Sequence, residues 1–194
     1  MTKRIILITG TPCVGKTATA NLLTSKLNAK HINLTELATR QNLIVGKDAE
    51  RNSIIINENK MKSKIHELIE KANKDTIIDG HYAPSVVPKK LATHTFVLRR
   101  DPVELKKHME KCGFSGLKLW ENLASEILDV CLVDALKAQR KGKVCEIDVT
   151  GKSVEEIVNE ILDILDGRRE CCVGVADWLG KLEREGLLSE YLKI

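Results

Sequence analysis

A glycine-rich segment near the start of the chain has the residue types and spacing that bind triphosphates. Residues 10–17 read G-T-P-C-V-G-K-T and fit the pattern G-x-x-x-x-G-K-[ST] without a gap. In such a loop the backbone N–H groups surround phosphate oxygens, the lysine contacts the terminal phosphates, and the hydroxyl ligates Mg²⁺. The sequence therefore predicts a nucleoside triphosphate site made of Gly10, Cys13, Val14, Gly15, Lys16, Thr17 and Ala18.

The segments on either side of this loop supply the strand and the helix that such a site needs. Residues 5–8 are an apolar, β-branched run typical of a buried strand. After the loop, apolar residues recur at helical spacing, at Ala18, Leu22, Leu23 and Leu27. A strand, a glycine loop and a helix bring unpaired N–H groups and the positive helix end to one point. An ordinary strand-to-helix turn would need neither the lysine nor the threonine.

The second candidate site lies where another apolar strand ends. Residues 76–79 read T-I-I-D, so Asp79 follows a buried strand and is predicted to hold Mg²⁺ together with Thr17. An aspartate in this position can also simply cap the strand. His81 lies just beyond, at the sheet edge where ligands bind in open α/β folds. We predict that His81 orients a water or an acceptor group, although an isolated histidine is often only structural.

Cations that gather charge on a moving phosphoryl group are also expected near this edge. The pair Arg99-Arg100 ends a further strand, and Lys107, Lys111 and Lys118 surround a glycine-containing loop. The guanine-specific pattern N-K-x-D is absent, because residues 73–75 read N-K-D. GTPase switch chemistry is therefore disfavoured.

The composition suits one globular domain inside the cell. The chain has 194 residues, 43% of them hydrophobic, and a formal net charge of +4, too small to imply nucleic-acid or membrane binding. Aromatic residues make up only 3%, which disfavours a base-stacking surface. No apolar run is long enough to span a bilayer, and the first residues are too short for a secretory signal. We expect a cytoplasmic protein, or a nuclear one in a eukaryote.

The six cysteines show no C-x-x-C pair, so a zinc site is disfavoured. We expect free thiols in a reducing compartment, with Cys131 and Cys145 as small core residues. Cys13 lies beside a lysine and a helix N-terminus, an environment that favours the thiolate. Cys13 is therefore predicted to be reactive, and its alkylation is predicted to block nucleotide binding.

Strand-like and helix-like segments alternate, which predicts a parallel α/β sheet. The predicted strands are residues 4–9, 31–33, 76–79, 95–99 and 144–148, and the predicted helices include 61–72, 119–135 and 154–165. Two segments break the alternation, residues 34–60 and 111–118, and both are expected to be movable lobes over the substrates rather than plain surface loops. Residues 167–194 are expected to form short helices that pack on the core.

Several motifs together resemble one family. They are the glycine loop, Asp79-Gly80-His81, and residues 32–34, 46–51, 97–101 and 121–127. In this order and with few gaps, from residue 4 to about 165, the chain resembles the atypical adenylate kinases that are associated with small-ribosomal-subunit maturation. These are nuclear in eukaryotes and also occur in archaea.

The resemblance implies a single P-loop kinase domain over residues 1–194, with a five-stranded parallel sheet flanked by helices. It implies a nucleoside-monophosphate (NMP) segment at 33–56, a lid at 111–121 and a helical extension at 167–194. The implied activity is transfer of the γ-phosphoryl group of MgATP to AMP or another NMP, with ATPase activity. The implied partners are a small-subunit platform protein and the pre-ribosome, without a membrane and without sequence-specific nucleic-acid contacts. The implied site residues are Lys16, Asp79 and His81 for catalysis, Arg99 and Cys112 at ATP, and Asn33, Arg40 and Arg51 at the NMP.

The chain departs from the family pattern at three places. Members usually carry glycine where this chain has Cys13, and arginines where it has His108 and Cys112. Nearby lysines could take the place of these arginines, but lysine lacks the bidentate geometry of arginine. We therefore expect ATP binding to survive and phosphoryl transfer to be weaker. The alternatives are an ATP-hydrolysing ribosome assembly factor with little kinase turnover, and a small-metabolite kinase of the shikimate type. The match at 121–127 argues against the second.

Overall fold

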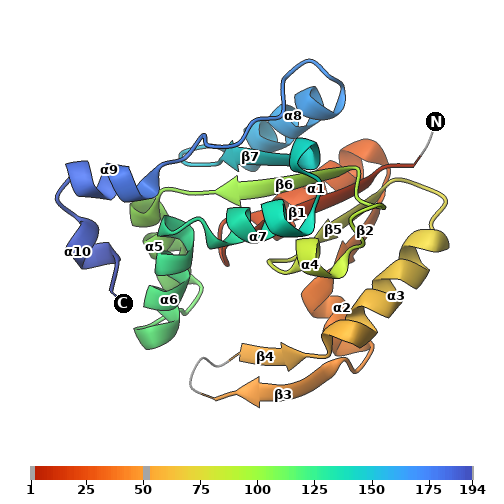
Figure 1. Ribbon diagram of the computed structural model, residues 1–194, viewed down its shortest axis with the longest axis horizontal. Helices are drawn as coiled ribbons and strands as arrows, with labels where there is room; N and C mark the ends of the chain where they lie inside the picture. Colours follow the sequence, from red (N-terminus) through yellow and green to blue (C-terminus); the bar gives the residue numbers. More distant parts are fainter. Residues whose placement is uncertain (1–2, 50–52, 194) are drawn as a thin grey trace.

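A five-stranded parallel sheet forms the centre of the computed structural model, which describes residues 3–49 and 53–193 (Figure 1). The strand order is β2-β5-β1-β6-β7. All six residues of β1 are buried, as expected for a central strand covered on both faces. The predicted α/β class and the five strands are confirmed. Their bounds are β1 Ile5–Gly10, β2 Lys30–Asn33, β5 Thr76–Asp79, β6 His94–Arg99 and β7 Val144–Asp148.

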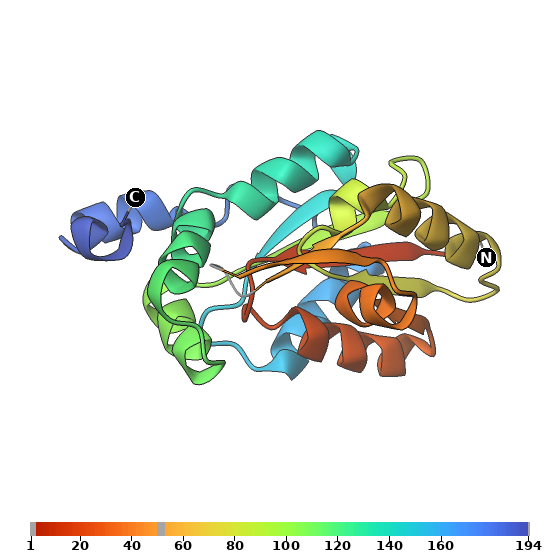
Figure 2. The same ribbon diagram turned by 90° about the horizontal axis from the view of Figure 1, so that it is seen from below.

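Helices cover both faces of the sheet (Figure 2). One face carries α1 (Lys16–Leu27) and α8 (Val154–Leu165), and the other carries α3 (Glu58–Glu70), α4 (Ala83–Val86) and α7 (Val130–Ala138). Side chains of β1 alternate between two separate cores: Ile6 and Ile8 pack on the α1 side, and Ile5 and Leu7 on the α3 side. The remaining helices are α2 Leu34–Arg40, α5 Pro102–Lys111, α6 Gly116–Ile127, α9 Trp178–Arg184, α10 Leu188–Tyr191 and the 3₁₀ turn η1 Lys141–Lys143.

The segment 34–60 contains a β-hairpin that the sequence analysis did not predict. Strands β3 (Ile44–Asp48) and β4 (Ser53–Ile56) pair antiparallel, and Figure 1 shows the hairpin projecting from the body of the sheet. Its isoleucines and Val45 favour strands, but the charged residues between them obscure the pattern. The hairpin and α2 together occupy the segment expected to bind an NMP.

The single helix expected over residues 119–135 is two helices, α6 and α7. Asp129 interrupts it with φ +57° in the left-handed region. Its carboxylate lies 2.5 Å from Nη2 of Arg99, which is buried under the helices. A buried guanidinium requires carboxylate partners, so we attribute the break to this ion pair.

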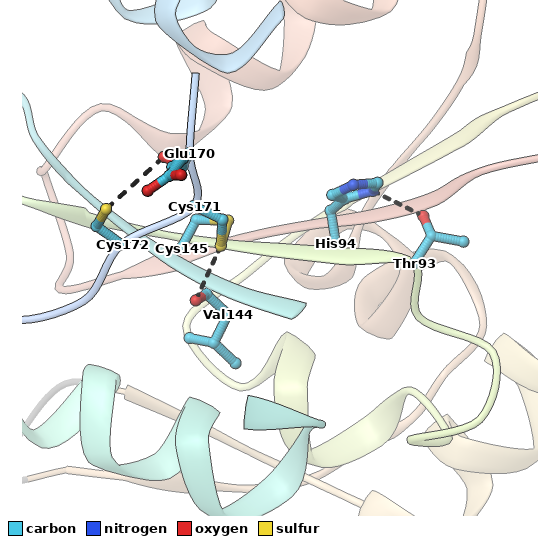
Figure 3. The surroundings of a disulfide bond; sticks show 7 residues. All are labelled: Thr93, His94, Val144, Cys145, Glu170, Cys171 and Cys172. Carbon is cyan, nitrogen blue, oxygen red and sulfur yellow. Dashed lines mark hydrogen bonds between the residues drawn. A yellow bond between two sulfur atoms is a disulfide. The ribbon is translucent and has the colours of Figure 1, made fainter. Parts of the chain in front are cut away.

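A disulfide links the C-terminal segment to the sheet. The expectation that all cysteines are free thiols is therefore wrong. Cys145 of β7 and Cys171 form a disulfide (Figure 3), whereas the sequence analysis expected free thiols. Their proximity follows from the path of the chain, because the backbone N–H of Glu146 donates to the carbonyl of Cys172 at 2.8 Å. Of the described cysteines, Cys13, Cys112, Cys131 and Cys172 remain thiols.

The C-terminal helices pack against the core as expected. Leu182 of α9 and Tyr191 of α10 are buried together with Ile127 of α6. In the part of the chain that the structure covers, none of the helices combines the length and the apolar character needed to cross a bilayer.

Candidate functional site

The glycine loop joins β1 to α1, and its backbone requires glycine at two positions. Gly10 and Gly15 have φ of +136° and +115°, and a Cβ on Gly10 would lie 2.4 Å from the carbonyl oxygen of Leu98. The first hydrogen bond of the α1 helix runs from the backbone N–H of Thr19 to the carbonyl oxygen of Gly15, at 3.1 Å. The N–H groups of residues 16–18 have no acceptor within the ranges 3–49 and 53–193. Unpaired N–H groups at the positive end of a helix are suited to bind an anion.

Lys16 lies against the loop itself. Its Nζ donates to the carbonyl oxygen of Thr11 at 2.8 Å. Burial lowers the pKa of Lys16, although Cys131 and Asp79 nearby favour its charged form. An ammonium group with little hydration interacts strongly with any anion that enters the loop.

The hydroxyl of Thr17 and the carboxylate of Asp79 meet at the carboxyl ends of the strands. Thr17 Oγ1 donates to Asp79 Oδ2 at 2.7 Å, and Asn33 Nδ2 donates to the same oxygen at 3.1 Å. Asp79 is 1% exposed, and its other oxygen lies 2.7 Å from His31 Nε2. Hydroxyl and carboxylate oxygens are the donors that Mg²⁺ prefers, so Thr17 and Asp79 fit this ion.

His31 was missed by the sequence analysis. The predicted strand 31–33 did contain a usable signal, because His31 and Asn33 alternate along it and therefore lie on one face. Parallel pairing of β2 with β5 places Asn33 opposite Asp79. That register brings the side chains of His31 and Asn33 to the carboxylate.

A cleft of about 860 Å³ adjoins the loop, with His81 in its wall. His81 is exposed at the surface of the cleft. Partial desolvation by the surrounding residues and the charge of Lys16 lower the pKa of its ring, so the ring is neutral near pH 7. The neighbouring Tyr82 packs edge-on against it at 4.8 Å, and its hydroxyl finds no hydrogen-bond partner among the described residues. Other residues that line the cleft are Thr11, Pro12, Ser53, Glu58, Asn122 and Ser125.

Arg99 does not lie at the loop. It is 1% exposed and its guanidinium pairs with Glu126, Glu146 and Asp129, so it belongs to a buried ion cluster. Its neighbour Arg100 reaches the loop instead: Nε and Nη2 lie 3.4 Å from the carbonyl oxygen of Val14. Arg99 is the last residue of β6 and Arg100 follows it, so the two side chains take different directions.

Cys13 has φ +64°, a left-handed conformation that explains why glycine suits this position. The structure contradicts the expected thiolate. Burial and the adjacent Cys112 thiol raise the pKa of Cys13 to about 12, and the opposing effects of Lys16 and Lys118 are smaller. The positive charge of the loop therefore does not offset desolvation of the thiolate.

This raised pKa predicts the pH dependence of Cys13 labelling. Because only the thiolate reacts, the alkylation rate at Cys13 should rise about tenfold per pH unit between pH 7 and 9. Complete labelling should abolish MgATP binding, since the adduct would fill the loop. Peptide mass spectrometry and ATP titration measure the two effects. A Cys13→Ser variant treated in the same way should keep its affinity, and undiminished affinity of labelled wild type would contradict the expectation.

The structure describes two of the three residues expected at the NMP, Asn33 and Arg40. Asn33 lies beside Thr17 and Asp79, and its Oδ1 also accepts the N–H of Glu36 at the start of α2. Arg40 is exposed and pairs with Glu36 at 3.0 Å. Arg51 lies outside the described residues. Cys112 ends α5 and is exposed.

Comparison with known proteins identifies relatives of this chain. The family described as AAA domain matches residues 6–129. A protein of Methanocaldococcus jannaschii named "Putative adenylate kinase" is 40% identical over 91% of this chain and 93% of its own length. One of the same name from Saccharolobus solfataricus is 35% identical over 98% of this chain and 95% of its own.

Solved structures share the fold at low sequence identity. The thymidylate kinase of Candida albicans has a TM-score of 0.56 at 16% identity and covers 86% of this chain and 92% of its own. A sugar kinase from Janibacter has a TM-score of 0.57 at 16% identity, over 85% of this chain and 95% of its own. The chain thus has the P-loop kinase fold, and its sequence shows that it belongs to the family of these archaeal adenylate kinase-like proteins.

Proposed function

We propose that the protein is an adenylate-type NMP kinase. An oxygen of the AMP phosphate attacks the γ-phosphorus of ATP, the bond from that phosphorus to the β,γ-bridging oxygen breaks, and two ADP molecules result. The observation that carries this proposal is the contact of Thr17 with Asp79 at 2.7 Å at the N-terminus of α1, together with an open cleft lined by Thr11 and Pro12 of the same loop. The glycine loop beside that contact would hold ATP, and the cleft has room for the acceptor.

The loop residues bind and neutralise the triphosphate. N–H groups of residues 13–18 would cradle its oxygens, and Lys16 would leave the carbonyl of Thr11 to contact the β- and γ-phosphates. Thr17 and Asp79 would hold Mg²⁺, which when bound supplies positive charge to those oxygens. His31 and Asn33, which bond to its two oxygens, would keep the Asp79 carboxylate oriented.

The acceptor would bind in the cleft. A neutral His81 can exchange hydrogen bonds with the acceptor phosphate or a water without adding charge. Asn33, Arg40 and Arg51 are the proposed contacts of the NMP phosphate, and Arg40 would have to leave Glu36 to serve. Segments 33–56 and 111–121 would close over both nucleotides and exclude water.

A second candidate is an ATP-hydrolysing assembly factor that acts with a small-subunit platform protein and the pre-ribosome. One observation favours it: the lid region lacks arginine. His108 pairs only distantly with Glu104, at 3.8 Å, and Cys112 offers a thiol. A site that binds MgATP but stabilises the transition state poorly would suit a slow, partner-dependent ATPase.

One assay separates the two candidates. ADP formation from MgATP is measured with a panel of NMPs and metabolites, without an acceptor, and with the platform protein added. ADP formation that depends on an NMP supports the kinase. Hydrolysis that needs no acceptor and that the partner stimulates supports the assembly factor. If no ADP forms under any of these conditions, both candidates are refuted.

The absence of arginine from the lid region predicts that adding one there increases kinase turnover. Replacing Cys112 with arginine should raise the NMP-dependent turnover number at least about tenfold, because an arginine there can stabilise charge on the moving phosphoryl group. The KM for ATP should change less than the turnover number. A Cys112→Ser variant controls for loss of the thiol, and equal turnover of the arginine and serine variants would count against the role of the lid.

A further inference from the structure

We propose that the C-terminal segment is part of the ATP site, with Glu126 and Trp178 as positioning residues for the glycine loop. Trp178 lies in α9, far from the loop in sequence. The inference rests on the proposed ATP site, and it assigns a function to a segment outside the residues proposed above to contact either nucleotide. A chain of hydrogen bonds carries it, from Trp178 through Glu126 to Thr11 in the glycine loop, next to Lys16.

Glu126 is the centre of this chain. It is 1% exposed, and its Oε1 accepts from Arg99 Nε at 2.8 Å, from the backbone N–H of Arg100 at 3.1 Å and from Trp178 Nε1 at 3.0 Å. Its Oε2 accepts from the hydroxyl of Thr11. A buried carboxylate depends on such donors for its orientation as well as its stability, because no water replaces a donor that is lost.

Thr11 transmits this orientation to the loop. It is fully buried, it is the second residue of the G-x-x-x-x-G-K-T motif, and its side chain bonds to Glu126. Its carbonyl oxygen accepts the Nζ of Lys16 at 2.8 Å. A shift of Glu126 would therefore move the loop backbone next to the lysine that is to contact phosphate.

The C-terminal segment is anchored on both sides of Trp178. Before it, the disulfide of Cys145 and Cys171 fixes the chain beside β7 (Figure 3), and the N–H groups of Gly174 and Val175 donate to Glu146 Oε2 at 2.6 and 2.9 Å. After it, Lys181 pairs with Asp101. Figure 1 shows this segment running from α8 past β7 to α9.

The hydrogen bond of Trp178 is separable from the packing of α9. Leu182 is fully buried against α6 and α10, which gives α9 its own apolar contact. Loss of the indole N–H alone would leave that packing in place and remove one donor from Glu126. The loop, rather than the stability of the helix, is then the part of the molecule that responds.

The test is a double-mutant cycle on MgATP affinity, with Trp178→Phe, Thr11→Val and the double variant. Each single variant should weaken the Kd for MgATP by about threefold to tenfold, and the double variant should be little weaker than either. Because phenylalanine is smaller, benzothienylalanine incorporated at position 178 provides a second variant, which keeps the bicyclic ring but lacks the N–H. It should reproduce the loss.

Leu182→Ala is the matched control. It should lower the thermal midpoint of unfolding without changing the Kd of the folded protein. Two results would overturn the inference while leaving the ATP site intact. One is an unchanged Kd for MgATP in both position-178 variants. The other is a double variant whose loss of affinity equals the product of the losses in the two single variants. A wild-type protein that binds no MgATP would overturn the proposed function and this inference together.

Discussion

Replacement of Lys16 by methionine is expected to lower NMP-dependent phosphoryl transfer by about 10²–10³-fold, the usual cost of removing one preorganised charge from a transition state. Lys16 Nζ bonds to the loop carbonyl of Thr11, next to the N–H groups at the start of α1, and burial strengthens its field. Turnover at saturating MgATP and AMP measures the effect.

The same substitution should not destabilise the fold. Burial lowers the pKa of Lys16 in the folded protein below its unfolded value, so its charged form opposes folding and does so increasingly as the pH falls through that range. An apolar side chain of similar length removes this cost. The thermal midpoint of Lys16→Met at pH 7 is therefore expected to equal or exceed that of wild type, which separates a chemical defect from an unfolded enzyme.

Lys26→Met serves as the control for loss of a lysine from α1. Lys26 pairs with Glu155 at 2.5 Å on the surface and lies in the last turn of the helix. Its removal should leave turnover unchanged. Wild-type turnover in Lys16→Met would exclude the proposed role of Lys16, and an equal loss in both variants would point to a general effect on α1.

Local chemistry explains which features the sequence could predict. Residues 5–17 specify a strand, a turn and a helix start within one short stretch, and the glycines are required by the loop backbone itself. Asp79 could be predicted as a partner of Thr17 because the carboxyl ends of parallel strands meet at one edge. These inferences needed only residue type, spacing and the geometry of a parallel sheet.

Features that depend on contacts between distant segments could not be predicted in the same way. The helix break at Asp129 follows from its pairing with Arg99, 30 residues earlier in the chain. The disulfide depends on Cys171 returning to β7 after α8. The pKa of Cys13 depends on how deeply the loop is buried and on Cys112, which belongs to another helix. The periodicity of the sequence does not show which of these distant residues come into contact.

Replacement of Arg99 by methionine is expected to cost about 3–5 kcal/mol of unfolding free energy, the range for removing one partner from a buried ion pair. Arg99 is the cation between Glu126 and Glu146, both almost fully buried, and the half-exposed Asp129. Burial favours loss of the Arg99 proton, but the carboxylates outweigh it and raise the pKa of Arg99. The variant would leave two buried carboxylates without their counter-charge.

Urea unfolding measures this loss, with Arg168→Met as the control. Arg168 also pairs with two carboxylates, Asp163 and Asp166, but all three side chains are largely exposed. Water can solvate the partners that remain, so the midpoint should not move. Equal midpoints for Arg99→Met and wild type would show that the buried cluster contributes nothing to stability.

Neutralising one carboxylate should recover part of the loss. Glutamine at position 146 keeps an oxygen that can accept the N–H groups of Gly174 and Val175, but it carries no charge. The double variant Arg99→Met/Glu146→Gln should therefore be more stable than Arg99→Met alone, even though Glu146→Gln by itself removes a partner from Arg99. Such a reversal of sign is specific to buried charge, since a substitution that merely loosened packing would add its cost in both backgrounds.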